Sequence, residues 1–119
     1  MSGSAAESAG KTVSLVVDYG DGSEVHFKSL PWRSGMTVLD ALESVKSHPH
    51  GVEFRARGRG TTALVTKIGD QANEGGAGSS RNWIFRVNGN KGEVGAGAYE
   101  LKPAEAVLWK FETYEEPPQ

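Results

Sequence analysis

Apolar and polar residues alternate with a period of two along much of this chain. Val13, Leu15 and Val17 recur at every second position, and the alternation resumes over 24–28 after a glycine-rich turn at 19–23. A period of two is typical of strands buried on one face. The sequence therefore predicts a hairpin at the start of the folded part.

One helix is predicted over 37–47. Thr37 can cap its first turn, with Asp40 three residues later as the acid of a capping box. Pro49 disfavours helical geometry at the residue before it and ends the helix. The apolar positions recur at helical spacing and form one stripe for a core, namely Val38, Ala41, Leu42 and Val45.

The second half of the chain predicts more strands. Asn88-Gly89 is a strong hairpin signal, because both residues tolerate a positive φ. A polar stretch over 69–81 lacks apolar periodicity and predicts a long loop, and a turn with proline second is expected at 102–105. The expected strands cover 52–56, 63–68, 82–87, a return through about 94, and 106–114.

A hairpin, one helix and further strands ending in a long apolar strand follow the order of a β-grasp fold. We therefore expect an α+β, β-grasp domain, with a single helix packed on a curled mixed sheet with β-hairpins. The expected boundaries are a domain over 12–114, a disordered tail over 1–11 and a charged tail over 115–119.

Composition narrows the classes of function. With 119 residues one domain is expected. The net charge of −2 gives no positive field for nucleic acid, and the absence of cysteine excludes disulfides and thiolate chemistry.

No apolar run of the sequence is long enough to span a membrane. Residues 1–10 do not resemble a signal peptide, although export stays open if a signal was trimmed. A soluble monomer is expected.

Seven short segments, in this order and spacing, resemble the transcobalamin-like C-terminal domain family, which includes the small domain of the cobalamin carriers transcobalamin and intrinsic factor. They are VDYGDG at 17–22, GMTVLDAL at 35–42, NEGG at 73–76, NW at 82–83, VNG at 87–89, VGAGAYEL at 94–101 and VLWKF at 107–111.

The resemblance implies a β-grasp fold and, in the carriers, a role in covering one face of a corrin ring. The carriers hold cobalamin between this domain and a large helical barrel, for which 119 residues leave no room. Where the family has a Gly-Asp turn before its last strand, this chain has Ala104-Glu105. No cofactor is expected, and cobalamin is a candidate ligand.

Candidate ligand-binding residues lie on the strands and the bend that the family places near its ligand. Trp83, Tyr99 and Trp109 offer rings with a polar edge, which suit a flat apolar ligand. The alternative for Trp83 and Trp109, which the general burial of large aromatic residues favours, is a position as core aromatics of a strand pair. Asn82 and Arg86 offer hydrogen bonds beside them, with a solvated surface as the alternative for Arg86. These five residues predict a non-catalytic binding module for a flat, corrin-like small molecule or a polymer.

A second hypothesis comes from three arginines at alternate positions, Arg55, Arg57 and Arg59. In an extended segment they would form a basic strip, which either contacts a protein partner along an exposed sheet edge or is a solvated face. A protein-interaction or surface-scaffold module is therefore the alternative function.

Neither a metal site nor an active site is expected. His48 and His50 lack a third ligand at metal-site spacing, and His26 lies on the opening hairpin. No serine, histidine or aspartate falls in a catalytic signature. The sequence therefore predicts that this protein is not an enzyme.

Overall fold

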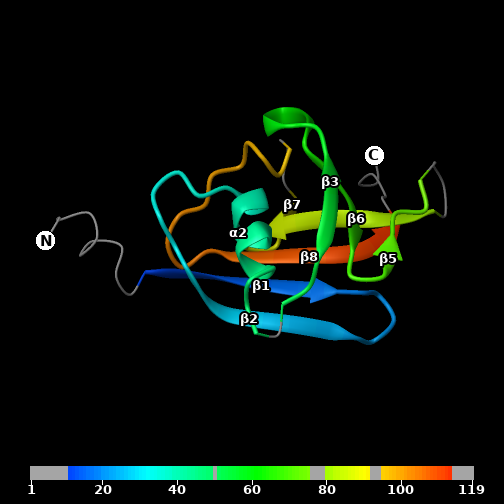
Figure 1. Cartoon of the computed structure of the whole chain (residues 1–119), viewed down its shortest axis with the longest axis horizontal. Coiled ribbons are helices and arrows are strands. Elements are labelled where there is room, and N and C mark those ends of the chain that lie inside the picture. Colours follow the sequence, from blue (N-terminus) through cyan, green and yellow to red (C-terminus); the bar gives the residue numbers. More distant parts are fainter. Residues whose placement is uncertain (1–10, 50, 76–79, 92–94, 114–119) are drawn as a thin grey trace, which may run out of the picture.

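Two sheets and a helix form the folded part of the protein, shown in Figure 1 as a computed structural model. The structure describes residues 11–49, 51–75, 80–91 and 95–113. The elements in chain order are β1 (Thr12–Asp18), β2 (Glu24–Pro31), α2 (Val38–Val45), β3 (Phe54–Arg57), η1 (a 3-10 turn, Gly60–Thr62), β4 (Leu64–Ile68), β5 (Gln71–Ala72), β6 (Arg81–Val87), β7 (Asn90–Lys91) and β8 (Ala106–Thr113).

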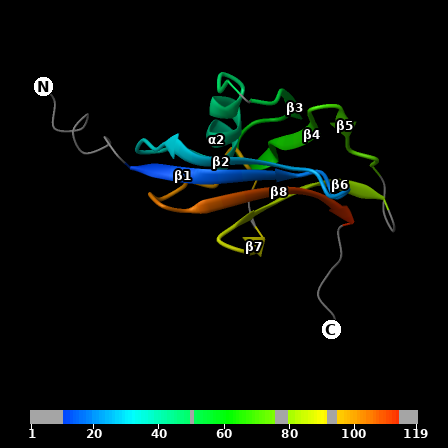
Figure 2. The ribbon, with the colours of Figure 1, turned by 90° about the horizontal axis from the view of Figure 1, so that it is seen from below.

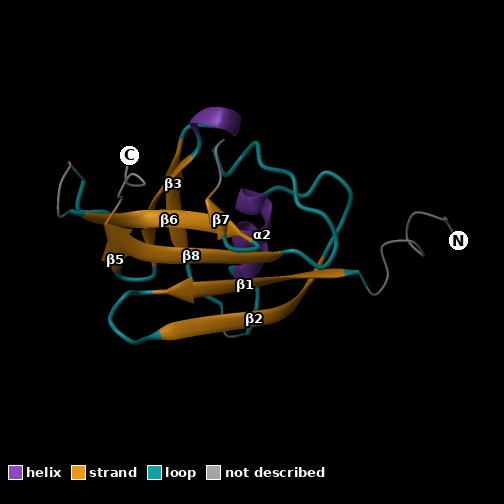
Figure 3. Cartoon of the chain, turned by 180° about the vertical axis from the view of Figure 1, so that it is seen from behind, coloured by secondary structure: helices purple, strands orange, loops and turns teal. Residues whose placement is uncertain are grey.

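The larger sheet has five strands in the order β2-β1-β8-β6-β7, which Figure 3 shows from behind. The first and last strands lie side by side and run parallel, with Val17 opposite Trp109. The other neighbouring pairs are antiparallel. The sheet is therefore mixed, and its centre is formed by chain segments far apart in sequence.

The smaller sheet has three antiparallel strands in the order β3-β4-β5. Figure 2 shows that this sheet and α2 lie on the same side of the larger sheet. The architecture is thus an α+β fold in which one face of a mixed sheet is covered by a helix and a second small sheet.

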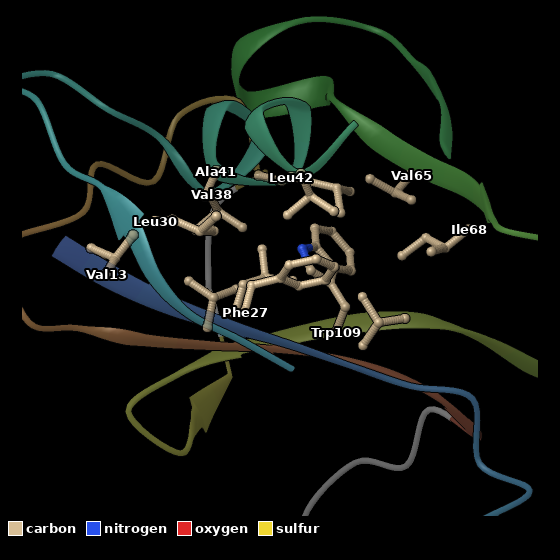
Figure 4. Close-up of a cluster of buried hydrophobic side chains, with 14 of the residues drawn as sticks. Val13, Phe27, Leu30, Val38, Ala41, Leu42, Val65, Ile68 and Trp109 are labelled. Atoms are coloured by element: carbon tan, nitrogen blue, oxygen red, sulfur yellow. The ribbon is translucent and has the colours of Figure 1, made fainter. Parts of the chain in front are cut away.

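The core lies between these layers. The four positions of the predicted helical stripe are all fully buried, and Figure 4 shows side chains from α2 and β4 meeting over Trp109. Thr37 Oγ1 accepts a hydrogen bond from the backbone N–H of Asp40, and Asp40 Oδ2 accepts one from that of Thr37. Both the helix and its capping box are therefore confirmed.

Several strand boundaries differ from the prediction. Strand β3 begins two residues later than expected and ends at Arg57. The polar stretch over 69–81 contains β5, which alternation cannot reveal because it is two residues long. The turn at Asn88 and Gly89 is confirmed, with φ of 51° and 85°. Residues 76–79, within the expected long loop, and residues 92–94, at the end of the expected return strand, lie outside the described residues.

Candidate functional site

An apolar hollow of about 210 Å³ lies where β4 approaches β6. We call it the Trp83 notch. None of its lining side chains is ionisable, so it can hold an apolar group but supplies no acid, base or nucleophile. Its lining residues are Ala63, Leu64, Val65, Trp83, Ile84, Phe85, Gly95, Ala96 and Trp109.

Trp83 forms a fixed part of this wall. Its side chain is 4% exposed, and its indole Nε1 donates a hydrogen bond to the backbone carbonyl of Gln71 at 2.9 Å. Tyr19 packs edge-on against the ring, with the centroids 5.4 Å apart. Because burial, a hydrogen bond and an aromatic contact act together, the ring holds one orientation.

Trp109 faces the notch from the neighbouring strand. It is 2% exposed and packs against Phe85 with ring centroids 5.2 Å apart. Its indole Nε1 is buried and has no hydrogen-bond acceptor among the described residues. A buried donor without a partner is unfavourable, and this N–H is the one buried side-chain polar group without a hydrogen bond in the described part of the chain.

A second, larger hollow of about 660 Å³ lies on the outer side of the small sheet. We call it the basic hollow, because three cationic side chains and no acidic one line it. Leu64 lines both hollows and is 48% exposed, the most exposed large hydrophobic side chain among the described residues. The lining residues are Arg55, Arg57, Leu64, Thr66, Lys67, Ala72, Asn73, Gly75 and Asn82.

The five predicted ligand-binding residues fall in four places. Trp83 and Trp109 line the notch, and Asn82 lines the basic hollow. Tyr99 is half-buried behind Phe85, in an edge-on contact with ring centroids 6.0 Å apart. The arrangement therefore brings three of the five to adjoining hollows.

Arg86, the fifth, lies elsewhere. Strand alternation puts it on the face opposite to Trp83 and Val87, which are buried. There it forms an ion pair with Glu112, in which each side chain is 21% exposed. Its guanidinium is therefore committed to a neighbouring strand rather than to the notch.

The arginines of the predicted basic strip are all exposed. Arg55 and Arg57 belong to β3, an edge strand of the small sheet, and both line the basic hollow. Arg59 follows the strand and precedes η1. A register shift between Arg55 and Ala56 interrupts the ladder with β4. Arg59 lies beyond the end of β3 and is not among the lining residues, so only two of the three arginines share the hollow.

Sequence reasoning did not select Leu64, Lys67 or Asn73. Leu64 sits in a correctly expected strand, but alternation does not distinguish an apolar residue that lines a hollow from one in the core. Asn73 belongs to the NEGG segment at 73–76, which contributed to the family resemblance but carried no prediction of a binding residue. Lys67 becomes relevant because β4 pairs it with Arg55.

Two side chains outside both hollows have shifted pKa values. Burial raises the pKa of Tyr19 above its ordinary 10.0, and the nearby carboxylates of Asp70 and Asp21 add to the rise. Hydrogen bonds from Ser23 to the carboxylate lower the pKa of Asp21.

Within the described ranges, no three histidine, aspartate or glutamate side chains are grouped to hold a metal ion. No helix in the same ranges is long and apolar enough to span a membrane.

The chain belongs to the family DUF4430, a domain of unknown function, whose model matches residues 35–113. A search of the curated proteins found no match. Among solved structures, the chain is similar to haptocorrin in complex with Cbi, with a TM-score of 0.73 and 17% identity over 88% of this chain and 25% of that one.

The chain is also similar to a provisionally assigned metal binding protein from Ruminococcus gnavus, with a TM-score of 0.65 and 16% identity over 87% of this chain and 99% of that one. At sequence identities of 16% and 17%, these similarities show a shared fold. Nearly the whole length of the Ruminococcus protein is matched, whereas this chain spans a quarter of the length of haptocorrin.

Proposed function

We propose that this protein is a non-catalytic binding module that takes the apolar ring of a small molecule in the Trp83 notch. The observation that carries the proposal is the notch itself, an open hollow walled by indole and aliphatic groups at the seam of two sheets. Ligand sites of proteins are concave and mostly apolar. The similarity to haptocorrin, whose structure holds Cbi, supports the same kind of role.

We also propose that the fold is a β-grasp and that the chain is a transcobalamin-like domain extending over 12–114. Two features support this assignment. The element order is a hairpin, a helix and further strands that end in a long apolar strand, and the similarity to haptocorrin covers 88% of this chain.

The size of the notch limits the contact. A volume of about 210 Å³ is below the roughly 300–1,000 Å³ of ordinary small-molecule pockets, so a corrin-sized ligand would contact this domain with one edge or face. One-sided contact buries less area while the entropy of association is still lost. We therefore expect weak binding of cobalamin or Cbi by this domain alone.

Titration of the labelled protein with Cbi, followed by backbone amide shifts, tests the proposal. The expected shifts cluster at Leu64, Trp83, Phe85 and Ala96. Leu64→Ala should weaken binding without unfolding the protein, because this side chain is half exposed. A matched truncation outside both hollows, Val25→Ala, should leave binding unchanged. Shifts that are absent or scattered at millimolar ligand would overturn the proposal.

The alternative function, a protein-interaction module, has one supporting observation. Strand β3 is an edge of the small sheet, and two of its residues are exposed arginines. An edge strand can pair with an extended peptide from a partner. Titration with an extended acidic peptide should then shift the amides of β3 and weaken with salt. Shifts confined to the Trp83 notch would decide against it.

A further inference from the structure

We infer that the ligand of the Trp83 notch carries an oxyanion, a carboxylate or a phosphate, and that Arg55, Arg57 and Lys67 hold this group in the basic hollow. The inference rests on the proposed function and adds the charge of the ligand to it. It follows from three features of the two hollows: the residue that they share, their charge and their hydrogen-bond donors.

The hollows adjoin at one residue. Leu64 lines both, and strand alternation in β4 buries its neighbour Val65 while Leu64 is left exposed. A ligand with an apolar ring in the notch would therefore pass over Leu64 before reaching the cations. This order, an apolar body followed by a charged end, fits an amphiphilic anion.

No described carboxylate forms an ion pair with the three cations of the basic hollow. Arg55 lies directly opposite Lys67 in the β3–β4 ladder, and like charges in opposed positions are destabilising. Glu53 and Asp70 line a separate hollow that Arg55 and Lys67 also line, but no ion pair joins these carboxylates to the two cations within the described ranges.

Other cations of the protein do have acidic partners. Lys46 pairs with Glu43 at 3.3 Å and Arg81 with Glu74 at 3.9 Å, and Arg86 pairs with Glu112. The basic hollow thus concentrates positive charge on a protein whose net charge is −2. A negative ligand group would relieve this repulsion.

The donor groups of the hollow suit an oxyanion. A guanidinium presents a planar fork of N–H groups that matches the oxygens of a carboxylate or phosphate. Asn82 Oδ1 accepts a hydrogen bond from the backbone N–H of Gly75 at 3.0 Å. Because that bond fixes the carboxamide, its NH₂ group is left as a further donor beside the cations.

Two aromatic probes distinguish the contribution of an anionic group to binding from that of the ring. Anilinonaphthalene sulfonate and neutral phenylnaphthylamine share the same ring system and differ by the sulfonate. We expect both probes to shift the amide signals of the notch. The sulfonate probe should bind more tightly than the neutral probe, and its affinity should fall as the salt concentration rises. Inorganic phosphate and acetate, added separately as competitors, show which oxyanion the hollow prefers.

The variant R55Q/R57Q removes two charges and keeps hydrogen-bonding side chains of similar length. It should weaken binding of the sulfonate by about twofold to fivefold per charge and leave the neutral probe unaffected. The matched control is K28Q/K102Q, which removes two exposed charges outside both hollows and should change neither affinity.

The outcomes distinguish this inference from the function on which it rests. If the neutral probe binds in the notch but the sulfonate brings no gain, or if R55Q/R57Q behaves like the control, the oxyanion assignment is wrong and the proposed function stands. If neither probe shifts the amides of the notch, the proposed function fails and the assignment fails with it.

Discussion

The carboxamide of Asn73 holds the backbone of Trp83 in place, because its Oδ1 accepts a hydrogen bond from the N–H of Trp83 at 2.8 Å. Its Nδ2 donates at the same time to the carbonyl of Val65 at 3.0 Å. One side chain therefore joins β4 of the small sheet to β6 of the large sheet, beside the seam where the notch opens.

Asn73→Ala should accordingly destabilise the protein. Both backbone groups would lose their partner, and a lost bond to a largely buried group costs about 1–3 kcal/mol. Urea unfolding followed by tryptophan fluorescence measures the difference. Asn90→Ala, at an exposed position in β7, is the matched control and should change the free energy of unfolding little. Equal effects of the two variants would contradict the bridging role of Asn73.

Leu42→Ala tests the packing of the helix on the sheet. Leu42 is fully buried, and truncation of a buried leucine removes apolar contacts and leaves a cavity, which costs about 2–5 kcal/mol. Glu43→Ala, at the next and exposed position, should have little effect. A loss in Leu42→Ala no larger than that in Glu43→Ala would exclude the core position of this side chain.

Ala104→Gly should stabilise the protein. Ala104 has a φ of 71°, in the left-handed region that is unfavourable for a residue with a Cβ atom. Relief of this strain outweighs the added entropy of glycine in the unfolded chain, so the free energy of unfolding should rise by about 0.5–1 kcal/mol.

Thermal and urea unfolding of Ala104→Gly would measure this gain. Ala98→Gly is the comparison at a position without a positive φ, and it should lower stability by about 0.4–1 kcal/mol. A loss of stability in both variants would show that the conformation of Ala104 carries no strain.

Alkaline pH should destabilise the protein through Tyr19. The folded state raises the pKa of this phenol above its ordinary 10.0, chiefly because burial disfavours the phenolate. Since the folded state binds its proton more tightly than the unfolded state, this contribution is complete below pH 10.0 and is lost as the pH rises from there through the raised value.

Unfolding measured over this alkaline range should show a decline that is smaller in Tyr19→Phe. Absorbance of the phenolate gives the pKa directly. Tyr99→Phe serves as the comparison variant. An unchanged decline in Tyr19→Phe, together with an ordinary pKa for Tyr19, would contradict the predicted coupling.

The local elements follow from the sequence because their signals are local. The spacing of apolar residues predicts α2, Thr37 and Asp40 cap it, and Asn88-Gly89 forces a turn through φ values that few other residue pairs accept. β5 was missed for the same reason, since two residues contain no period. The site itself could be predicted only in part. The sequence selected Trp83, Trp109 and Asn82, but it gave no reason to join Asn82 to Arg55 and Arg57.

The sequence by itself thus determined the helix, the Asn88-Gly89 turn and most of the strands, together with their apolar faces, because these depend on residues within a few positions of one another. Only the tertiary structure decided that β1 lies beside β8, that Leu64 joins two hollows, that Lys67 faces Arg55 and that Arg86 is committed to Glu112. These relationships join residues of different strands, and they arise when the apolar faces of α2, the small sheet and the large sheet are buried against one another.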